Sequence, residues 1–416
     1  MSFTEQARAA RTAAITLATA TRAEKDAALH AMADALLAAE TDILAANEVD
    51  IARAEESGTA ASLIDRLRLN HDRLVGMADG LRQLAELTDP VGDAVRSWTT
   101  PTGLEISQVR VPIGVIGIIY EARPNVTADA AGICLKSGNA SLLRGSSSAY
   151  DSNVEIVTAL RAGLAAAGFP EDAVALVAGG REVTTEMMTA RGLVDLLIPR
   201  GGAGLINAVV TGSQVPVIET GTGNCHLYVH GAADQQMALD IMLNAKLQRP
   251  SVCNALETLL VDESIADEFL ARALPELTGA GVTVHGDQRV VAAGNGSDAV
   301  VAAADGDFDE EWLSLDLSAK VVSGLDEAID HIREHTSGHS ETIVTGDPET
   351  AGRFVDRVDA AAVLVNASSR FVDGGEFGFG AEIGISTQKT HARGPMALPE
   401  MTSTKFVVRG TGQVRG

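Results

Sequence analysis

The stretch that decides the fold runs from residue 114 to residue 144 and reads GVIGIIYEARPNVTADAAGICLKSGNASLLR. Residues 115–120 form a continuous apolar run, which is typical of a strand buried on both faces of a parallel sheet. Residues 126–136 are predicted to form a helix, and residues 140–144 a second short strand. A strand, a helix and a strand at this spacing predict a right-handed βαβ unit.

The same alternation continues along the chain. Further strands are predicted over residues 174–177, 196–198 and 215–219, and helices over 153–167, over 183–190 and from residue 204. A second α/β series begins near residue 235, with a helix over 234–248 and strands over 256–261 and 362–365. Such alternation predicts an α/β fold with parallel sheets.

The flanking regions differ from this pattern. Residues 4 to about 88 carry Ala, Leu, Ile and Met at helical spacing and are predicted to be helices. Residues 105–111 alternate in character as a half-exposed strand does. The tail, residues 404–409, is one more predicted strand, and its partner is either the 105–111 segment or another subunit.

Composition excludes several classes of protein. The 416-residue chain is 46% hydrophobic, but no apolar run reaches the ~18 residues needed to span a bilayer, and no signal peptide is evident. Its formal net charge of -24 and its few aromatic residues argue against nucleic-acid binding. Three cysteines are too few for a disulfide framework, which favours a reducing cytoplasm.

The three cysteines lie in different settings. Cys134 falls in an apolar helical stretch and is interpreted as packing, and Cys225 leads into an apolar run where a core or a near-site role is open. Cys253 lies in a polar turn that contains Pro250, between a predicted helix and a predicted strand. That loop setting suits a nucleophile, although an inert buried thiol is equally compatible with the sequence.

Other polar residues lie where predicted strands end. Arg144 and Ser146 could hold a ribose or a 2′-phosphate at the ligand edge of the sheet, or form a solvated turn. Gly201 and Gly202 open a helix, so their amides could face a phosphate or a nicotinamide, or only form a tight turn. Asn125 could cap a helix or donate to an oxyanion.

Two further features leave their roles open. Glu219 ends a predicted strand before a glycine turn and could be a general base or a turn carboxylate. His331 and His335 match His-x-x-Glu-His, a zinc pattern. The break at Thr336-Ser337-Gly338 puts the second histidine at a fraying helix end, and no clear third ligand follows, so a polar helix end or a substrate loop is favoured.

Together these pieces resemble the aldehyde dehydrogenase superfamily, and within it the branch that reduces glutamyl phosphate. The segments that carry the resemblance are residues 120–127, 137–146, 219–224, 248–255, 328–343 and 382–396. The 328–343 segment is the most specific to that branch, and it accounts for the histidine pattern without a metal.

The resemblance implies a Rossmann-type cofactor domain (residues 1–99 and 112–230), an α/β catalytic domain (231–395) and a small β flap for oligomerisation (100–111 and 396–416). It also implies a reaction of proline biosynthesis, in which L-glutamyl 5-phosphate and NADPH give L-glutamate 5-semialdehyde, phosphate and NADP. Cys253 would form a thioester and Asn125 would stabilise the oxyanion. The residues implied for NADP(H) are Arg144, Ser146, Gly201, Gly202, Glu219 and Glu311, those for the substrate are His339 and Ser340, and no metal is implied.

Two residues depart from the superfamily's pattern. Arg144 stands where Lys is usual, which is compatible with the 2′-phosphate of NADP. Glu219 stands where other members activate water for hydrolysis, a reaction that a reductase must avoid.

The implied protein is cytoplasmic, a homodimer or homotetramer, functionally coupled to glutamate 5-kinase, with no nucleic-acid or membrane partner. An ordinary aldehyde dehydrogenase and a non-catalytic binding protein are the alternatives, and the presence of both Asn125 and Cys253 disfavours the second.

Overall fold

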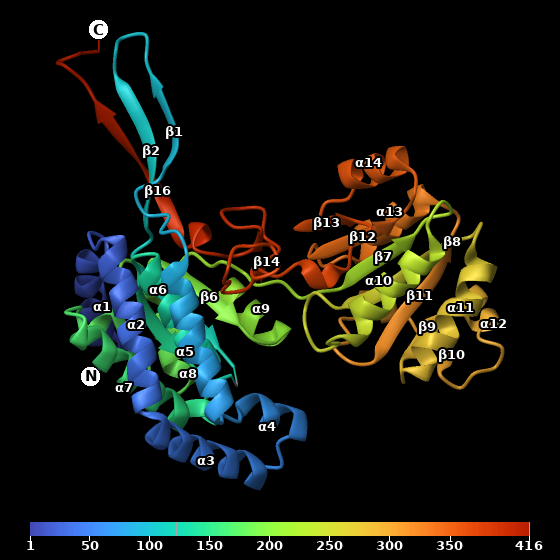
Figure 1. Cartoon of the computed structure of the whole chain (residues 1–416), viewed down its shortest axis with the longest axis horizontal. Coiled ribbons are helices and arrows are strands. Elements are labelled where there is room, and N and C mark those ends of the chain that lie inside the picture. The colour runs from blue at the N-terminus through green and yellow to red at the C-terminus, as the bar shows by residue number, and fades with distance from the viewer. Residues whose placement is uncertain (122, 416) are drawn as a thin grey trace. The chain divides into compact units, whose positions relative to one another are not determined.

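The computed structural model describes residues 1–121 and 123–415, with the backbone alone for Ser62. The chain divides into two compact units (Figure 1). The first contains Met1–Thr220, Gly378–Gly384 and Met396–Gly416, and the second contains Gly221–Phe377 and Ile385–Pro395. Each unit has its own parallel sheet and its own buried apolar core.

A four-stranded parallel sheet, in the order β5-β4-β3-β6, forms the centre of the first unit. Its strands are β3 (Val115–Tyr120), β4 (Ala140–Arg144), β5 (Val174–Leu176) and β6 (Leu196–Arg200). Every residue of β3 is buried, and β3 pairs in parallel with both β4 and β6. The predicted βαβ unit is confirmed, because α6 (Asn125–Lys136) connects β3 to β4.

Helices make up most of the rest of the first unit, as the N-terminal pattern predicts. They are α1 (Phe3–Leu17), α2 (Arg22–Ala38), α3 (Glu40–Glu56), α4 (Ala61–Leu67), α5 (His71–Glu86), α7 (Tyr150–Ala166), α8 (Arg181–Thr189) and α9 (Ala203–Gly212). α1 and α2 each begin with a capping box, in which Ser2 pairs with Glu5 and Thr21 with Glu24. α2 packs on α5 and α7 through a buried apolar face.

A seven-stranded parallel sheet, in the order β10-β9-β11-β8-β7-β12-β13, forms the second unit. The strands are β7 (Cys225–Val229), β8 (Leu256–Asp262), β9 (Thr283–Gly286), β10 (Val300–Ala302), β11 (Asp316–Val322), β12 (Ser340–Val344) and β13 (Ala362–Val365). The helices are α10 (Gln235–Leu247), α11 (Ala266–Gly279), α12 (Gln288–Ala293), α13 (Leu325–His335) and α14 (Pro348–Arg357). A two-stranded piece, β14 (Ile385–Ser386) with β15 (Gly394–Pro395), completes this unit.

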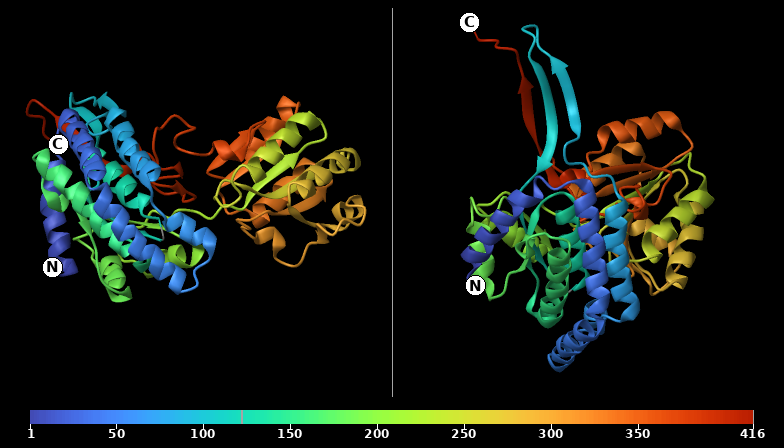
Figure 2. Two further views of the ribbon diagram at one scale, coloured as in Figure 1. Left: turned by 60° about the horizontal axis from the view of Figure 1, so that its bottom comes forward. Right: turned by 60° about the vertical axis from the view of Figure 1, so that its left-hand side comes forward.

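An antiparallel ribbon of three strands belongs to the first unit. It consists of β1 (Ala94–Thr99), β2 (Glu105–Pro112) and β16 (Thr402–Arg409), with β2 in the middle. The C-terminal strand β16 therefore pairs with the segment around residues 105–111, which is one of its two predicted partners. Figures 1 and 2 show the ribbon extending away from the helices of the first unit.

The fold class predicted from the sequence is confirmed, but two details differ. The strand predicted over residues 215–219 is reduced to one isolated bridge between Leu197 and Val217, since Pro216 has no N–H to donate. The second α/β series begins earlier than residue 235, with β7, which lies between β8 and β12. No helix among the described residues combines the length and the apolar character needed to cross a membrane.

Candidate active site

Cys253 lies in a turn that connects α10 to β8 in the second unit, and its side chain is partly exposed. The backbone of Gly223 presses against this turn. A Cβ atom at Gly223 would lie 1.5 Å from the carbonyl oxygen of Cys253, a separation that no side chain can tolerate. The glycine turn at residues 221–223 and the Cys253 turn are therefore packed backbone to backbone.

A buried layer of polar side chains supports the Cys253 turn. The thiol of Cys225, at the start of β7, donates to the carbonyl oxygen of Cys253 at 3.2 Å. Burial raises the pKa of Cys225 well above its usual value, so this thiol stays protonated and can act as a donor. The Nδ1 atom of His339 lies 3.8 Å from the same sulfur and 2.7 Å from the hydroxyl of Ser340.

His339 and Ser340, the two residues implied for substrate contact, are both completely buried. Burial lowers the pKa of His339 to about 4, so its ring is neutral at pH 7. The side chain of His339 contacts Cys225 and Ser340. Because Cys225 in turn donates to the Cys253 carbonyl, these contacts connect His339 to the Cys253 turn.

A second loop is attached to the residue that follows Cys253. The side chain amide of Asn254 donates to the carbonyl oxygen of Val372 at 2.9 Å, and the hydroxyl of Ser369 donates to the carbonyl oxygen of Asn254 at 2.7 Å. Sequence reasoning missed this loop at residues 368–376. The local signals for it are the polar Ser368-Ser369-Arg370 run and the Asp373-Gly374-Gly375 turn sequence, both of which are common in loops.

Asn125 is the first residue of α6 in the first unit, and its side chain is exposed. Pro124 occupies the capping position without a side chain cap, so the capping alternative for Asn125 does not apply. The Asn125 amide instead donates to a carboxylate oxygen of Asp129 at 3.1 Å. Desolvation by the surrounding chain raises the pKa of Asp129 to about 6. Ala122, in the same motif, lies outside the described residues.

Arg144, at the end of β4, holds the loop that follows β5. Its terminal nitrogens donate to the carbonyl oxygens of Gly145, Gly179 and Gly180 at 2.8, 2.6 and 3.2 Å. Its Nε atom is buried without a hydrogen-bond partner in the described structure. Ser146, two residues further on, shares a 2.6 Å hydrogen bond with Ser148.

The turn at Gly201 and Gly202 opens α9, and it already faces an anionic group. The amide of Gly202 donates to a carboxylate oxygen of Glu121 at 2.9 Å. A Cβ atom at Gly201 would lie 2.4 Å from the same oxygen. The turn is a helix N-terminus whose Gly202 amide holds the Glu121 carboxylate, so a phosphate bound there would have to replace that carboxylate.

The chemistry of two groups in these loops is compatible with a nicotinamide dinucleotide. The Gly202 amide binds a carboxylate, an anion that stands in for a phosphate oxygen, and Arg144 brings a guanidinium to the end of β4. Both groups come from strand ends of one parallel sheet, the edge at which such folds bind nucleotides.

The two glutamates implied for the cofactor have different surroundings. Glu311 accepts a 2.6 Å hydrogen bond from the amide of Gly223, and burial raises its pKa. It therefore holds the glycine turn that packs on Cys253. Glu219 is half-buried and follows the isolated bridge at Val217.

The histidines of the zinc-like pattern lie on α13 among other aromatic rings. The ring of His331 lies 5.1 Å from that of Phe308 and 4.4 Å from that of His335. Burial, together with nearby His226 and His335, lowers the pKa of His331 to about 2. Its neutral ring packs in the core, and no group of three or more His, Cys, Asp or Glu in the described chain could hold a metal ion.

Comparison with known proteins shows the family of the chain. Residues 2–293 match the model of the aldehyde dehydrogenase family. The chain is 60% identical over 414 residues to a protein from Cutibacterium acnes, covering 99% of this chain and 98% of that one, and 59% identical over 407 residues to one from Thermobifida fusca, covering 98% and 97%. Both relatives are named gamma-glutamyl phosphate reductase.

A crystal structure of gamma-glutamyl phosphate reductase from Thermotoga maritima superposes on this chain with a TM-score of 0.97, at 47% identity and with 100% of both chains covered. The chain therefore belongs to the aldehyde dehydrogenase family, whose members use nicotinamide cofactors. Within that family it belongs with the relatives named gamma-glutamyl phosphate reductase, as its sequence motifs predict.

Proposed function

We propose that this chain catalyses the NADPH-dependent reduction of L-glutamyl 5-phosphate to L-glutamate 5-semialdehyde and phosphate, a step of proline biosynthesis. The single observation that carries the proposal is the partly exposed Cys253 in a turn fixed by Gly223 and Cys225, in a chain 60% identical to a gamma-glutamyl phosphate reductase.

The chemistry begins at Cys253. Its thiolate attacks the acyl carbon of the substrate, the carbon–phosphate oxygen bond breaks, and phosphate leaves with that bond's electron pair. The product is a thioester on Cys253. When bound, NADPH would supply the hydride that reduces the thioester carbon. The resulting thiohemiacetal then releases the aldehyde and returns Cys253 as a thiolate.

Negative charge develops on the acyl oxygen in both steps. The side chain amide of Asn125 and the backbone amide of Cys253 are the proposed donors to that oxygen. Each donor of this kind contributes roughly 3 kcal/mol to transition-state stabilisation. The hydrogen bond between Asn125 and Asp129 fixes which way the Asn125 amide points, and this supports the assignment.

NADP(H) is the proposed cofactor. Arg144 and Ser146 would contact the ribose and its 2′-phosphate, Gly201 and Gly202 would offer amides to a phosphate or the nicotinamide, and Glu219 and Glu311 would lie near the nicotinamide end. The position of Arg144 at the end of β4 and the anion-binding Gly202 amide support this set. The role of Glu219 in a reductase is to contact the cofactor or hold its turn, since activating water there would waste the thioester as free acid.

His339 and Ser340 were predicted to contact the substrate, and this stays a prediction. Their burial beneath Cys225 favours a second role for them, in which they set the position of the Cys253 turn.

The domain roles follow from the same assignment. Residues 1–99 and 112–230 would bind the cofactor, residues 231–395 would carry the nucleophile, and residues 100–111 and 396–416 would form the oligomerisation flap of a homodimer or homotetramer. The exposed apolar side chains of the ribbon support the flap, since Trp98, Phe406 and Val408 are 40%, 56% and 54% exposed. A cytoplasmic location and functional coupling to glutamate 5-kinase complete the proposal.

The test is NADP reduction by L-glutamate 5-semialdehyde, measured by absorbance with and without inorganic phosphate. The proposed enzyme reduces NADP only when phosphate is present, because phosphate is the acceptor of the acyl group. Equal rates without phosphate, with glutamate as the product, would instead identify an ordinary aldehyde dehydrogenase.

A further inference from the structure

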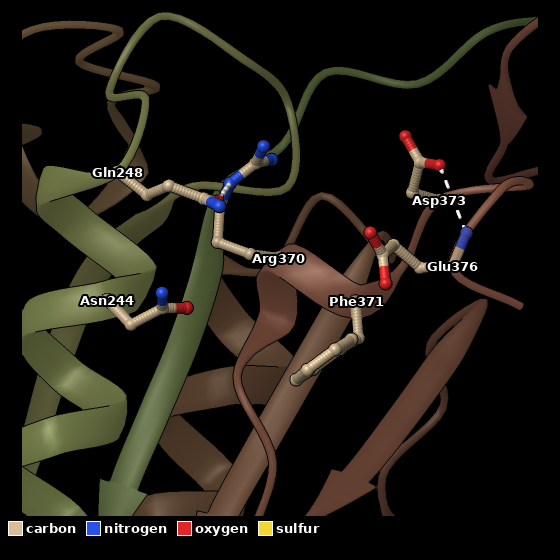
Figure 3. A pocket seen from close by; sticks show the side chains of 6 residues that line it. All are labelled: Asn244, Gln248, Arg370, Phe371, Asp373 and Glu376. Carbon is tan, nitrogen blue, oxygen red and sulfur yellow. Dashed lines mark hydrogen bonds between the residues drawn. The ribbon is translucent and has the colours of Figure 1, made fainter.

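A hollow in the second unit lies outside the residues discussed for the nucleophile and the cofactor. Its lining residues are Asn244, Gln248, Arg370, Phe371, Asp373 and Glu376, and its volume is about 160 Å³ (Figure 3). Pockets for drug-sized ligands usually measure ~300–1,000 Å³. The hollow is therefore the size of a small polar group rather than of a dinucleotide.

Both walls of the hollow are connected to the Cys253 turn. One wall is the end of α10, whose last residues lead directly into that turn. The other wall is η4 (Ser369–Phe371) together with the loop that follows it. Two hydrogen bonds attach this wall to Asn254, the neighbour of Cys253: Ser369 donates to the Asn254 carbonyl oxygen, and the Asn254 amide donates to Val372. Cys253 is also among the groups whose charge affects the pKa of Arg370. The hollow thus lies beside the candidate nucleophile.

Arg370 presents an unsatisfied cation to the hollow. Its Nε atom donates to the Gln248 side chain at 2.9 Å, and among the described residues it forms no ion pair. Burial, reinforced by the positive charge of Arg249, lowers the pKa of Arg370, and the negative charge of Asp373 opposes this shift. A partly desolvated guanidinium whose terminal nitrogens have no anionic partner is a favourable receptor for a carboxylate.

Two carboxylates face the hollow from the other side. Figure 3 shows Arg370 and Gln248 on one side and Asp373 and Glu376 across from them. Asp373 uses one oxygen to hold its own turn, accepting from the amides of Gly375 at 2.8 Å and Glu376 at 3.4 Å. The charge of Asp373 acts on Arg370, but no cation in the described part of the chain forms an ion pair with Asp373 or Glu376, so both remain able to receive one.

The charges of the hollow select among ligands. One guanidinium opposite two carboxylates complements a zwitterion, with a carboxylate on the arginine and an ammonium on the acids. A phosphate dianion would meet repulsion from Asp373 and Glu376, since like charges at close range disfavour binding. An uncharged aldehyde would leave Arg370 without a partner.

We propose that this hollow binds the α-carboxylate and the α-ammonium group of an amino-acid substrate, with Arg370 on the carboxylate and Asp373 and Glu376 on the ammonium. The proposal rests on the proposed function and adds the residues that select a glutamyl substrate. Two methylene groups separate the α-carbon of glutamate from its side chain acyl carbon. A substrate held here by its α-groups therefore has a short flexible arm with which to present that carbon to Cys253.

Steady-state kinetics of phosphate-dependent NADP reduction test the proposal, with wild type, Arg370→Met and Arg370→Lys. We expect Arg370→Met to lower kcat/KM for L-glutamate 5-semialdehyde by about tenfold to hundredfold, since a charged hydrogen-bond partner is lost. The effect should be mainly a higher KM for the semialdehyde, with the KM values for phosphate and NADP unchanged, and Arg370→Lys should restore part of the lost kcat/KM.

The two carboxylates are tested separately. Asp373→Asn and Glu376→Gln should each raise the KM for the semialdehyde, but not for glutarate semialdehyde, which has no amino group.

Two results would overturn the subsite. One is an Arg370→Met enzyme with an unchanged KM for the semialdehyde, and the other is a change in the KM for phosphate instead. A folded variant is verified by its melting temperature, and Arg370→Lys serves as the test if Arg370→Met does not fold.

A second measurement separates this proposal from the proposed function. L-Glutamate should slow the alkylation of Cys253 by iodoacetamide in wild type, and about tenfold to hundredfold more L-glutamate should be needed in Arg370→Met. If wild type does not reduce NADP, the proposed function fails while protection by L-glutamate still supports the subsite. If wild type is active and L-glutamate protects both proteins equally, only the subsite fails.

Discussion

Gly223 packs its backbone against the carbonyl of Cys253 so closely that a Cβ atom would lie 1.5 Å from the carbonyl oxygen. The same glycine donates its amide to Glu311 at 2.6 Å. One backbone position therefore links a buried carboxylate to the turn that carries the candidate nucleophile. No side chain other than hydrogen fits there without moving that turn.

Gly223→Ala is expected to displace Cys253 and to lower kcat/KM for the semialdehyde by about hundredfold, since a shift of about 1 Å in a reacting group has that effect. The measurement is the phosphate-dependent rate. Gly352→Ala is the matched control, because Gly352 lies on α14 with nothing within 4 Å of its added Cβ. The control should keep its rate and gain about 0.5–1 kcal/mol of stability. Equal rates in Gly223→Ala and wild type would contradict the argument.

Cys253→Ala is expected to abolish phosphate-dependent NADP reduction while keeping NADP binding, because the thioester cannot form. Rates are compared with NADP titrations followed by protein fluorescence. Cys134→Ala is the control, since Cys134 is buried in α6 and takes no part in the proposed chemistry. It should lose stability but not activity. Retention of the wild-type rate in Cys253→Ala would refute the thiol mechanism.

His339 is expected to make the protein less stable in acid. Its pKa is about 4 in the folded chain and about 6.5 when unfolded, so the unfolded state binds more protons between those pH values. Stability therefore falls as pH drops from about 6.5 to about 4, by ~3 kcal/mol from this residue. Urea titrations across that pH range measure the slope.

His339→Gln should flatten the pH dependence of stability, because it removes the titrating ring. His30→Gln should leave it unchanged, as His30 is exposed on α2. A slope that is the same in His339→Gln and wild type would show that other groups cause the acid sensitivity.

The three-stranded ribbon is expected to mediate self-association. Trp98 and Phe406 meet edge to face with their centroids 6.2 Å apart, and Val408 lies two residues further along the same face of β16. Phe406→Glu with Val408→Glu should lower the molar mass to that of a monomer. Burial of each apolar side chain in an interface would otherwise contribute ~1.5–3 kcal/mol to association. Lys405→Ala, on the opposite face, is the control. Light scattering measures the molar mass of each protein, and an unchanged mass in the double variant would exclude the ribbon as the interface.

Residue patterns at short spacing predict the strands and helices whose formation depends mainly on neighbouring residues. The apolar run at residues 115–120 can only be buried, and with the α6 pattern and residues 140–144 it predicted the βαβ unit. The strand predicted over residues 215–219 is longer than the observed pairing, because Pro216 limits that pairing to one bridge. The apolar run after Cys225 is not among the predicted strands, although it forms β7 in the middle of the second sheet, since an isolated apolar run does not say which strands it will pair with.

By itself, the sequence determined the α/β class, the family and the candidate residues Cys253 and Asn125, because each depends on residue types at short spacing. Only the tertiary structure decided which distant groups support them. Gly223 and Cys253, Gly202 and Glu121, and Asn254 and Val372 meet across long separations in the chain. The hollow around Arg370 also exists only after folding, since its charge pattern joins the end of α10 to the loop after η4. Such contacts are set by how strands and loops pack in three dimensions, and no local pattern encodes them.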